Sequence, residues 1–502
     1  MMPISKAQKD NKLTGADLAA LLVLLATAVL VNRDLHTSWL YIDDLFMWYS
    51  YKTQGIREFI FPSYTTHFRP VFWLLQWAEL SLIGSHMEYV IPINLGILVL
   101  TAWILYRMIF RVSGSRAVSL AGAMSFTASR FSCYSVSQLI GIIESVSLLL
   151  SLLCAAALYR YLRGGRRICF AGALLCYVLA CFTHERYIVL LPMFLYAAAV
   201  RCAGEKRLPA ALTDAAAALL VFAGILAVRY HFLGTLAPAG TGGTIVTQTF
   251  TLKEGLKNVG AQLVYLFGFN AGPIHLCGMT WQQTPLWIKA VSVLADGCIL
   301  YLCIRYVQAL VRDPEKTGRI RSLTELVFWL GFIIGCVTAS SVTIRLEMRW
   351  IHVSFAFCCL LLGHMTGCAG TRDPQRAVIY RGAAAAAFLL LLVSNVAYRA
   401  GFPDLYLFEE QARRESLVDV TYGSYGDDIF DMDIYVIGNF YQVTPFEEEY
   451  LLKPSEAVPD EDELHIIHVV TPEEVPAGEK VLILYEDPID DTYKVYEPAA
   501  AG

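Results

Sequence analysis

Apolar segments of roughly membrane-spanning length recur along the first 400 residues of the chain. A helix of about 20 apolar residues crosses the hydrocarbon core of a bilayer, and most of these segments come close to that length. The pattern predicts an all-α polytopic membrane protein with about eleven transmembrane helices. They are expected near residues 13–33, 89–110, 116–131, 139–159, 168–183, 187–200, 210–230, 286–306, 323–342, 350–367 and 381–399.

Basic residues between the apolar segments predict how the chain is oriented. Clusters of Arg and Lys fall between alternate segments, and three lysines precede the first one. Cytoplasmic loops accumulate positive charge, so the N-terminus is expected in the cytoplasm and the C-terminal region outside. The clusters lie at 107–116, 160–167, 201–207, 312–321 and 372–381. The first apolar segment has a basic flank and no small-residue cleavage site, which favours a retained anchor.

Two long segments, 34–88 and 231–285, fall on the outer side in this arrangement. The first contains RPVFWLLQWAELSLIG, residues 69–84, which is apolar but too short to span comfortably. Such a segment is typical of a helix that lies along the membrane surface. The second contains a similar candidate, LVYLFGFNAG, at residues 263–272.

The composition changes sharply after residue 400. Residues 401–502 contain 25 acidic and 5 basic residues, whereas the first 400 contain 19 acidic and 34 basic ones. DIYVIGNFYQV, LHIIHVV and KVLILYE are short, β-branched and aromatic, which predicts strands. We therefore expect two domains: a membrane domain at 1–400 and a small acidic extracytoplasmic domain with β-strands at 401–502. All 13 cysteines precede that second domain, so no disulfide framework is expected there.

Four polar clusters lie near the predicted outer ends of the helices. In sequence order they contain Asp43 and Asp44, His67 and Arg69, His184 and Glu185, and Arg345 and Arg349. Ionisable groups at membrane depth are costly and are therefore functional candidates. We predict that these clusters meet around a cavity at the outer membrane surface.

The residue types in these clusters suit group transfer from a phosphate. Two neighbouring carboxylates raise the pKa of one of them, which can then act as a general base. Arginine binds phosphate through two parallel hydrogen bonds and keeps its charge. An acceptor hydroxyl could thus lose its proton to a carboxylate while arginines stabilise the departing lipid phosphate.

Simpler interpretations exist for each cluster. The aspartates could cap a helix, Arg69 could reach toward lipid headgroups, and Glu185 could be paired within its own turn. The two later arginines could anchor a helix end beside Trp350, and Arg130 could pair with Glu144. No Cys or His spacing indicates a metal site, so no cofactor is required, although a divalent cation bridging the acidic pair and a phosphate is possible.

The order of these elements resembles that of the GT-C membrane glycosyltransferases, including protein O-mannosyltransferases and related bacterial enzymes. A first span is followed by the pair Asp43–Asp44, then by a helix headed by Arg69–Pro70 and a span opening with YVIPINLGILVL. HERYIVLLP at 184–192 is similar to the KE…LP element of many members, and RLEMRW at 345–350 to their late Glu-x-Arg-aromatic element. His184 stands where a lysine is common, and the acidic tail matches no family domain.

This resemblance implies a glycosyltransferase that uses a polyprenyl-phosphate-linked sugar and inverts the anomeric centre. Asp43 would be the base and Asp44 its modulator, with Arg69 and Arg349 on the donor phosphate and His67, His184, Glu185 and Arg345 as further substrate-binding residues. The expected partners are the lipid donor, the membrane and an external acceptor, with no nucleic acid. The bacterial plasma membrane is the expected location. The alternative is a transporter or flippase for a lipid-linked sugar or another amphiphile, which should carry ionisable groups near the bilayer midplane.

Overall fold

The structure is a computed structural model that describes most of the chain between residues 13 and 496. Residues 38–39, 41–42, 63–65, 85, 206–207, 237–249, 271, 273–278, 314, 344–345, 401–405, 438–464, 477, 479 and 491 lie outside the described part. Arg345, one of the predicted site residues, is therefore not described.

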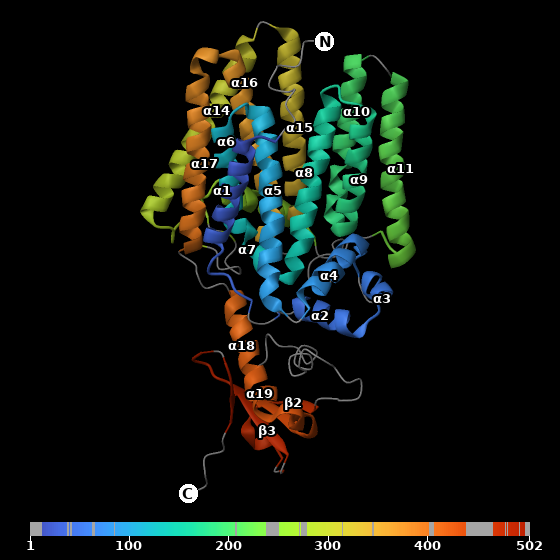
Figure 1. The fold of residues 1–502 in the computed structure, drawn as a ribbon, viewed down its shortest axis with the longest axis vertical. Helices are drawn as coiled ribbons and strands as arrows, with labels where there is room; N and C mark the ends of the chain where they lie inside the picture. The colour runs from blue at the N-terminus through green and yellow to red at the C-terminus, as the bar shows by residue number, and fades with distance from the viewer. Residues whose placement is uncertain are drawn as a thin grey trace.

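All eleven apolar segments are helical, and they form one bundle of helices that run alternately up and down (Figure 1). The helices are α1 (Gly15–Val31), α5 (Val90–Ser113), α6 (Arg116–Thr127), α8 (Ile142–Leu162), α9 (Arg167–Thr183), α10 (Leu191–Glu205), α11 (Leu208–Leu233), α14 (Leu286–Arg312), α15 (Lys316–Ser341), α16 (Met348–Arg372) and α17 (Ala377–Ala400).

Eight helical segments of the described chain are long and apolar enough to cross a membrane. They comprise α5, α8, α10, α11 and α14 to α17, four of them extended by a short 3-10 turn. Of the other three predicted segments, α1 and α9 have 17 residues each and α6 has 12. The chain is thus a multi-pass membrane protein with the predicted helices, and α6 ends four residues before the predicted boundary.

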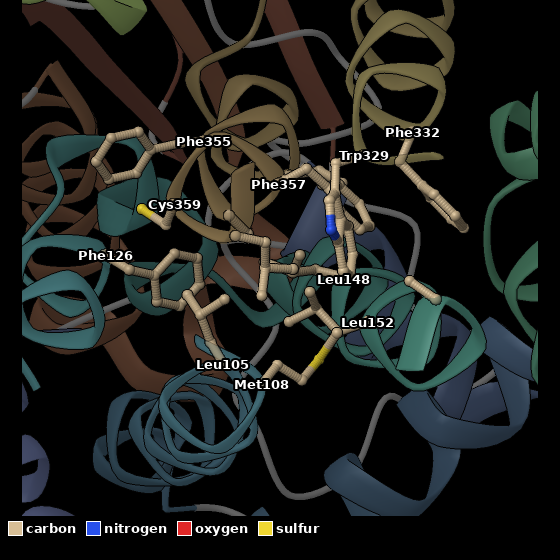
Figure 2. Packing of buried hydrophobic residues seen from close by; sticks show 14 of the residues in the cluster. Leu105, Met108, Phe126, Leu148, Leu152, Trp329, Phe332, Phe355, Phe357 and Cys359 are labelled. Atoms are coloured by element: carbon tan, nitrogen blue, oxygen red, sulfur yellow. The ribbon is translucent and has the colours of Figure 1, made fainter. Parts of the chain in front are cut away.

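Helix α16 is the centre of the bundle. Of its apolar window, 78% is buried inside the protein, compared with 22% for α11 and α14. Figure 2 shows Phe355, Phe357 and Cys359 of α16 packed among side chains from α5, α6, α8 and α15. A Cβ at Gly367 would clash with the backbone carbonyl of Val112, so glycine permits the close approach of α5 and α16. The low burial of α11 and α14 leaves apolar faces suited to lipid.

Local signals determine where several helices begin and end. Thr14 and Asp17 form a capping box at the start of α1, which satisfies backbone N–H groups that lack intrahelical partners. The expected surface helix is α4 (Pro70–Ile83), with Pro70 in its first turn. It ends before Gly84, whose φ of 61° lies in the region that favours glycine.

The two ends of the bundle differ in character. The turns that carry the predicted basic clusters all lie at one end, and the C-terminal domain lies beyond the other (Figure 1). We call the second end the domain end. Helices α2 (Asp43–Thr53), α3 (Ile56–Ile60) and α4 also lie there. The basic clusters therefore lie in alternate turns at one end of the bundle, as the sequence predicted.

The second surface helix lies earlier in the sequence than expected. Helix α13 covers Leu252–Leu266, so it contains only the first four residues of the predicted segment 263–272. Thr251 caps its first turn by accepting a hydrogen bond from the backbone N–H of Glu254. This cap sets the helix start, and the turn at Phe267–Asn270 follows it.

The C-terminal domain combines helix and sheet. Helix α18 (Tyr406–Val420), which the strand pattern did not reveal, precedes a four-stranded sheet of order β2-β1-β3-β4. The strands are β1 (Asp433–Ile437), β2 (His465–Val469), β3 (Val481–Glu486) and β4 (Tyr493–Val495). Strand β1 is parallel to β2 and β3, and β4 is antiparallel to β3. The three predicted strands are confirmed, and β4 is an addition.

Candidate functional site

Asp44 links α2 to the beginning of α8. Its Oδ2 accepts a hydrogen bond of 2.7 Å from the backbone N–H of Leu139, and its Oδ1 accepts one of 2.7 Å from Ile140. Residues Leu139–Gly141 form the 3-10 turn η4 that leads into α8. The carboxylate therefore caps the turn at the head of a membrane-spanning helix, and its position is fixed from both oxygens.

The surroundings of Asp44 shift the pKa of its carboxyl group toward neutral pH. The side chain is only 4% exposed, and burial raises the pKa of the carboxyl to about 7. The two backbone hydrogen bonds and the positive charge of Arg349 oppose that shift, while the charge of Asp43 adds to it. A carboxylate with a pKa near the working pH has the proton affinity expected of a general base.

Asp43 is in a different setting from its neighbour. It is exposed, whereas Asp44 points into the protein, because adjacent positions at the start of α2 face different sides of the helix. The structure thus separates the acidic pair into one solvated and one buried carboxylate. Asp44 is the better candidate for a catalytic base, because the pKa of its carboxyl group is raised to about 7.

A further buried carboxylate, Glu79, lies near Asp44. It projects from α4, is buried, and accepts a 3.0 Å hydrogen bond from Nε2 of Gln76. Burial and the charge of Asp44 raise the pKa of the Glu79 carboxyl well above its usual range. The sequence analysis did not single it out, although an acid in the apolar segment 69–84 is a signal that could have identified it.

His67, Arg69 and Glu185 form one hydrogen-bonded group. Arg69 donates from Nε to Oε2 of Glu185 at 2.6 Å and from Nη2 to Oε1 at 2.9 Å, and His67 Nδ1 lies 2.5 Å from Oε1. Glu185 opens the 3-10 turn η5 (Glu185–Leu190), which leads into α10. The segment between α1 and α5 is thereby attached to the α9–α10 hairpin, and Glu185 is paired across 116 positions in sequence rather than within its own turn.

Glu144, in the first turn of α8, is the centre of a second group. Its carboxylate accepts hydrogen bonds from Arg186 and from Nε1 of Trp350 at 2.6 Å, and His184 Nε2 lies 3.5 Å from Oε1. The suggested pair with Arg130 does not form. Arg186 occupies Glu144 instead, and Arg130 donates to the backbone carbonyl of Asn270. His184 Nδ1, 3.9 Å from Glu185, connects the two groups.

Arg349 lines a small cavity at the domain end. The cavity is lined by Arg349, Glu144, His352, Ser132, Ser135 and Thr101, together with apolar side chains. The Nε of Arg349 is buried, and no residue in the described part of the chain accepts its hydrogen. The Oγ of Ser135 also has no partner there. Unpaired donors beside a carboxylate leave room for a polar group of a bound molecule.

Seven of the eight predicted site residues are described, and six of them meet at the domain end. Asp44 and Arg349 interact electrostatically, while His67, Arg69, His184 and Glu185 continue the network along η5. Arg69 is committed to Glu185, whereas Nε of Arg349 and Nη1 of Arg186 have no hydrogen-bond partner among the described residues. Within the described ranges, no group of three Asp, Glu, His or Cys side chains is arranged to hold a metal ion.

Glu144 and Arg186 are the components of this network that the sequence analysis did not choose. The sequence analysis considered Glu144, which lies in the first turn of a long apolar helix, only as a possible partner of Arg130. Arg186 is adjacent to the chosen Glu185. Their pairing depends on how α8 packs against η5, which the sequence pattern does not specify.

Comparison with known proteins returns matches among solved structures only. No protein-family model and no curated protein sequence matches the chain. An oligosaccharyltransferase from Archaeoglobus fulgidus in the apo form aligns with 91% of this chain at 12% identity and a TM-score of 0.47. The archaeal oligosaccharyltransferase AglB from Archaeoglobus fulgidus, in complex with an inhibitory peptide and a dolichol-phosphate, aligns with 91% at 12% identity and a TM-score of 0.46. The chain covers 65% and 64% of these two chains, which is just under two thirds of their length.

Proposed function

We propose that this chain is a membrane glycosyltransferase of the GT-C type. It would move a sugar from a polyprenyl-phosphate-linked donor to a hydroxyl group of an acceptor at the outer membrane surface. The observation that carries the proposal is the buried Asp44 carboxylate, whose pKa of about 7 suits a base and which lies within the electrostatic reach of Arg349.

The proposed reaction is a single displacement. Asp44 takes the proton of the acceptor hydroxyl as its oxygen forms a bond to the anomeric carbon of the sugar. The bond between that carbon and the phosphate oxygen breaks, and the lipid phosphate leaves with the bonding electrons. Arg349 stabilises the charge that develops on the phosphate. Attack opposite the leaving group inverts the anomeric centre.

The other residues of the network would position these two groups. Arg69, His67 and Glu185 hold the outer loop against the helical hairpin, and Glu144 binds Trp350, the residue that follows Arg349. The pair of Arg69 and Glu185 supports a positioning role for Arg69 rather than direct contact with the phosphate. Asp43, exposed beside Asp44, is available to the acceptor or to a divalent cation.

The proposal includes a location and partners. The basic end of the bundle would face the cytoplasm of a bacterial cell, and the domain end would face outward. The donor would then reach the site from the outer leaflet. The acidic C-terminal domain would lie on the acceptor side, and the acceptor would be a glycan, a protein or a lipid.

Sugar transfer by the purified full-length protein tests the proposal. A panel of polyprenyl-phosphate sugars is offered to wild type, Asp44→Asn and the matched control Asp43→Asn. We expect Asp44→Asn to lower transfer or donor hydrolysis by about 10²- to 10⁴-fold, the range for loss of an acid–base group. Asp43→Asn should retain more activity. Equal activity in Asp44→Asn and wild type would refute the assignment of the base.

One observation favours the alternative, a transporter or flippase. Asp296 lies in the interior of the membrane-spanning helix α14, and both of its carboxylate oxygens are buried without a hydrogen-bond partner among the described residues. A carboxyl group at that depth is the feature expected of a transport pathway. No charged side chain in the described part of the chain pairs with Asp296, whereas the paired groups gather at the domain end. The enzyme therefore remains the proposal.

A further inference from the structure

His352 lies one turn after Arg349 on α16 and lines the same cavity. Residues three positions apart on a helix project from the same side. The side chain of His352 is only 3% exposed, and the proposed reaction assigns it no role. Its contacts within the protein show which of its atoms remain for a ligand.

Phe126 of α6 fixes the orientation of the His352 ring. The two rings are stacked, with their centroids 4.1 Å apart and an angle of 8° between their planes. The Nε2 atom of His352 lies 3.2 Å from the backbone carbonyl oxygen of Phe126. One face and one nitrogen of the imidazole are therefore occupied by the same residue.

The contact with this carbonyl determines which nitrogen carries the hydrogen. A carbonyl oxygen only accepts hydrogen bonds, and a neutral imidazole has one N–H donor and one acceptor nitrogen. In the neutral ring, Nε2 therefore carries the hydrogen and Nδ1 has the lone pair. Nδ1 has no hydrogen-bond partner among the residues that the structure describes. It is thus the polar atom of His352 that remains for a group in the cavity.

The other polar groups of the cavity show what kind of group fits. Nε of Arg349 and Oγ of Ser135 have no partner in the described part of the chain and can donate. Nδ1 of His352 and the carboxylate of Glu144 accept hydrogen bonds. A phosphate oxygen cannot donate to these two acceptors, whereas a hydroxyl group both donates and accepts. The cavity is small, so it suits one hydroxyl group of a larger molecule.

We propose that Nδ1 of His352 accepts a hydrogen bond from a hydroxyl group of the donor sugar, which makes His352 a specificity-determining residue. Arg349, one turn earlier, would hold the phosphate to which that sugar is attached. This role rests on the proposed function, because it takes the sugar of the lipid donor as the ligand. A site with a buried acceptor for a hydroxyl group rejects an analogue that lacks it, because the acceptor is then left unpaired.

Donors that lack single hydroxyl groups test this role with the full-length protein. Polyprenyl-phosphate glucose, mannose and galactose are each compared with their monodeoxy analogues, and kcat/KM for transfer is measured. We expect wild type to prefer one parent sugar over one of its analogues by about tenfold or more, which corresponds to the loss of one hydrogen bond. Equilibrium binding of the same donors to the protein in detergent gives a second readout that does not require transfer.

Three substitutions separate sugar recognition from the contact with Phe126. His352→Gln can still donate to the Phe126 carbonyl but has no acceptor at the position of Nδ1, and His352→Asn has the opposite properties. His352→Phe keeps only the ring stack, and the Phe126 carbonyl still accepts a 3.2 Å hydrogen bond from the backbone N–H of Ser129. We expect the Gln and Phe variants to lower kcat/KM for the parent donor by about tenfold and to lose the preference. The Asn variant should retain the preference.

The outcomes distinguish the role of His352 from the proposed function. Transfer that depends on Asp44 but shows the same preference in His352→Gln, His352→Phe and wild type would overturn the role of His352 and leave the enzyme in place. No transfer, combined with a binding preference that His352→Gln removes, would support the role of His352 and refute the enzyme. The absence of both transfer and binding would overturn both.

Discussion

Arg69 and Glu185 form a two-point ion pair between segments that are distant in sequence. The guanidinium donates to both carboxylate oxygens, at 2.6 Å and 2.9 Å, and both side chains are largely buried. His67 contacts the same carboxylate at 2.5 Å. The pair fixes the loop that carries α2 and α4 against the hairpin that carries His184 and Arg186.

Breaking one side of this pair should destabilise the protein. Arg69→Met leaves the buried Glu185 carboxylate beside His67 and His184 without the arginine charge, and we expect a loss of about 3–5 kcal/mol in the free energy of unfolding. Replacing both partners, with Arg69→Met and Glu185→Leu, removes the uncompensated charge and should recover much of the loss. Unfolding in detergent, followed by circular dichroism, measures both variants. A double variant no more stable than Arg69→Met would contradict this explanation.

The protonation of Asp44 should make activity depend on pH. Its pKa of about 7 means that the carboxylate is present above that value and is lost below it, so transfer should rise with pH and level off above about 7. The raised pKa also means that the folded state binds this proton more tightly than the unfolded chain does. Its contribution to stability is therefore complete below about pH 4 and is lost as the pH rises through about 7.

The Asp44→Asn variant checks both parts of this pH dependence. Its residual transfer should lack the rise near pH 7, and its midpoint of thermal unfolding should change less between pH 4 and 8 than that of wild type. Asp43→Asn, with the same change of charge at an exposed position, should keep the rise in activity but move it to lower pH, because the charge of Asp43 raises the pKa of Asp44. An unaltered profile in Asp44→Asn would assign the titration to another group.

Arg349 should act on the chemical step more than on folding. Its Nε has no partner in the described part of the chain, so Arg349→Gln removes few contacts within the protein. We expect transfer to fall by about 10²- to 10³-fold, as when one stabilising donor is removed from a transition state, with little change in thermal unfolding. Arg381→Gln serves as the control for net charge. Full activity of Arg349→Gln would exclude the proposed phosphate contact.

Asp296 distinguishes the two candidate functions. In an enzyme whose site lies at the domain end, Asp296→Asn should leave sugar transfer within about twofold of wild type, since conservative changes away from a site have small effects. In a transporter, the same change should abolish translocation of a fluorescent polyprenyl-phosphate sugar in proteoliposomes. The pair of assays therefore gives opposite results for the two functions.

The amino-acid sequence determined the helical membrane domain, its alternation and the three main strands of the C-terminal domain. These features follow from apolar length, the placement of Arg and Lys, and β-branched runs, which are local properties of the chain. The surface helix α4 was also predictable, because Pro70 and Gly84 mark its ends. Helix α18 was not, because its charged sequence lacks an apolar pattern.

The tertiary structure decided which polar residues form the candidate site. Asp43 and Asp44 are equivalent in sequence, and only the packing of α2 against the start of α8 makes one a buried cap and leaves the other in solvent. From the sequence, Arg69 and Arg349 were both candidate phosphate ligands. The structure separates them, because Arg69 is paired with Glu185. Burial and partner choice depend on contacts between distant segments, whereas the hydrophobic pattern records only the preference of each segment for water or lipid.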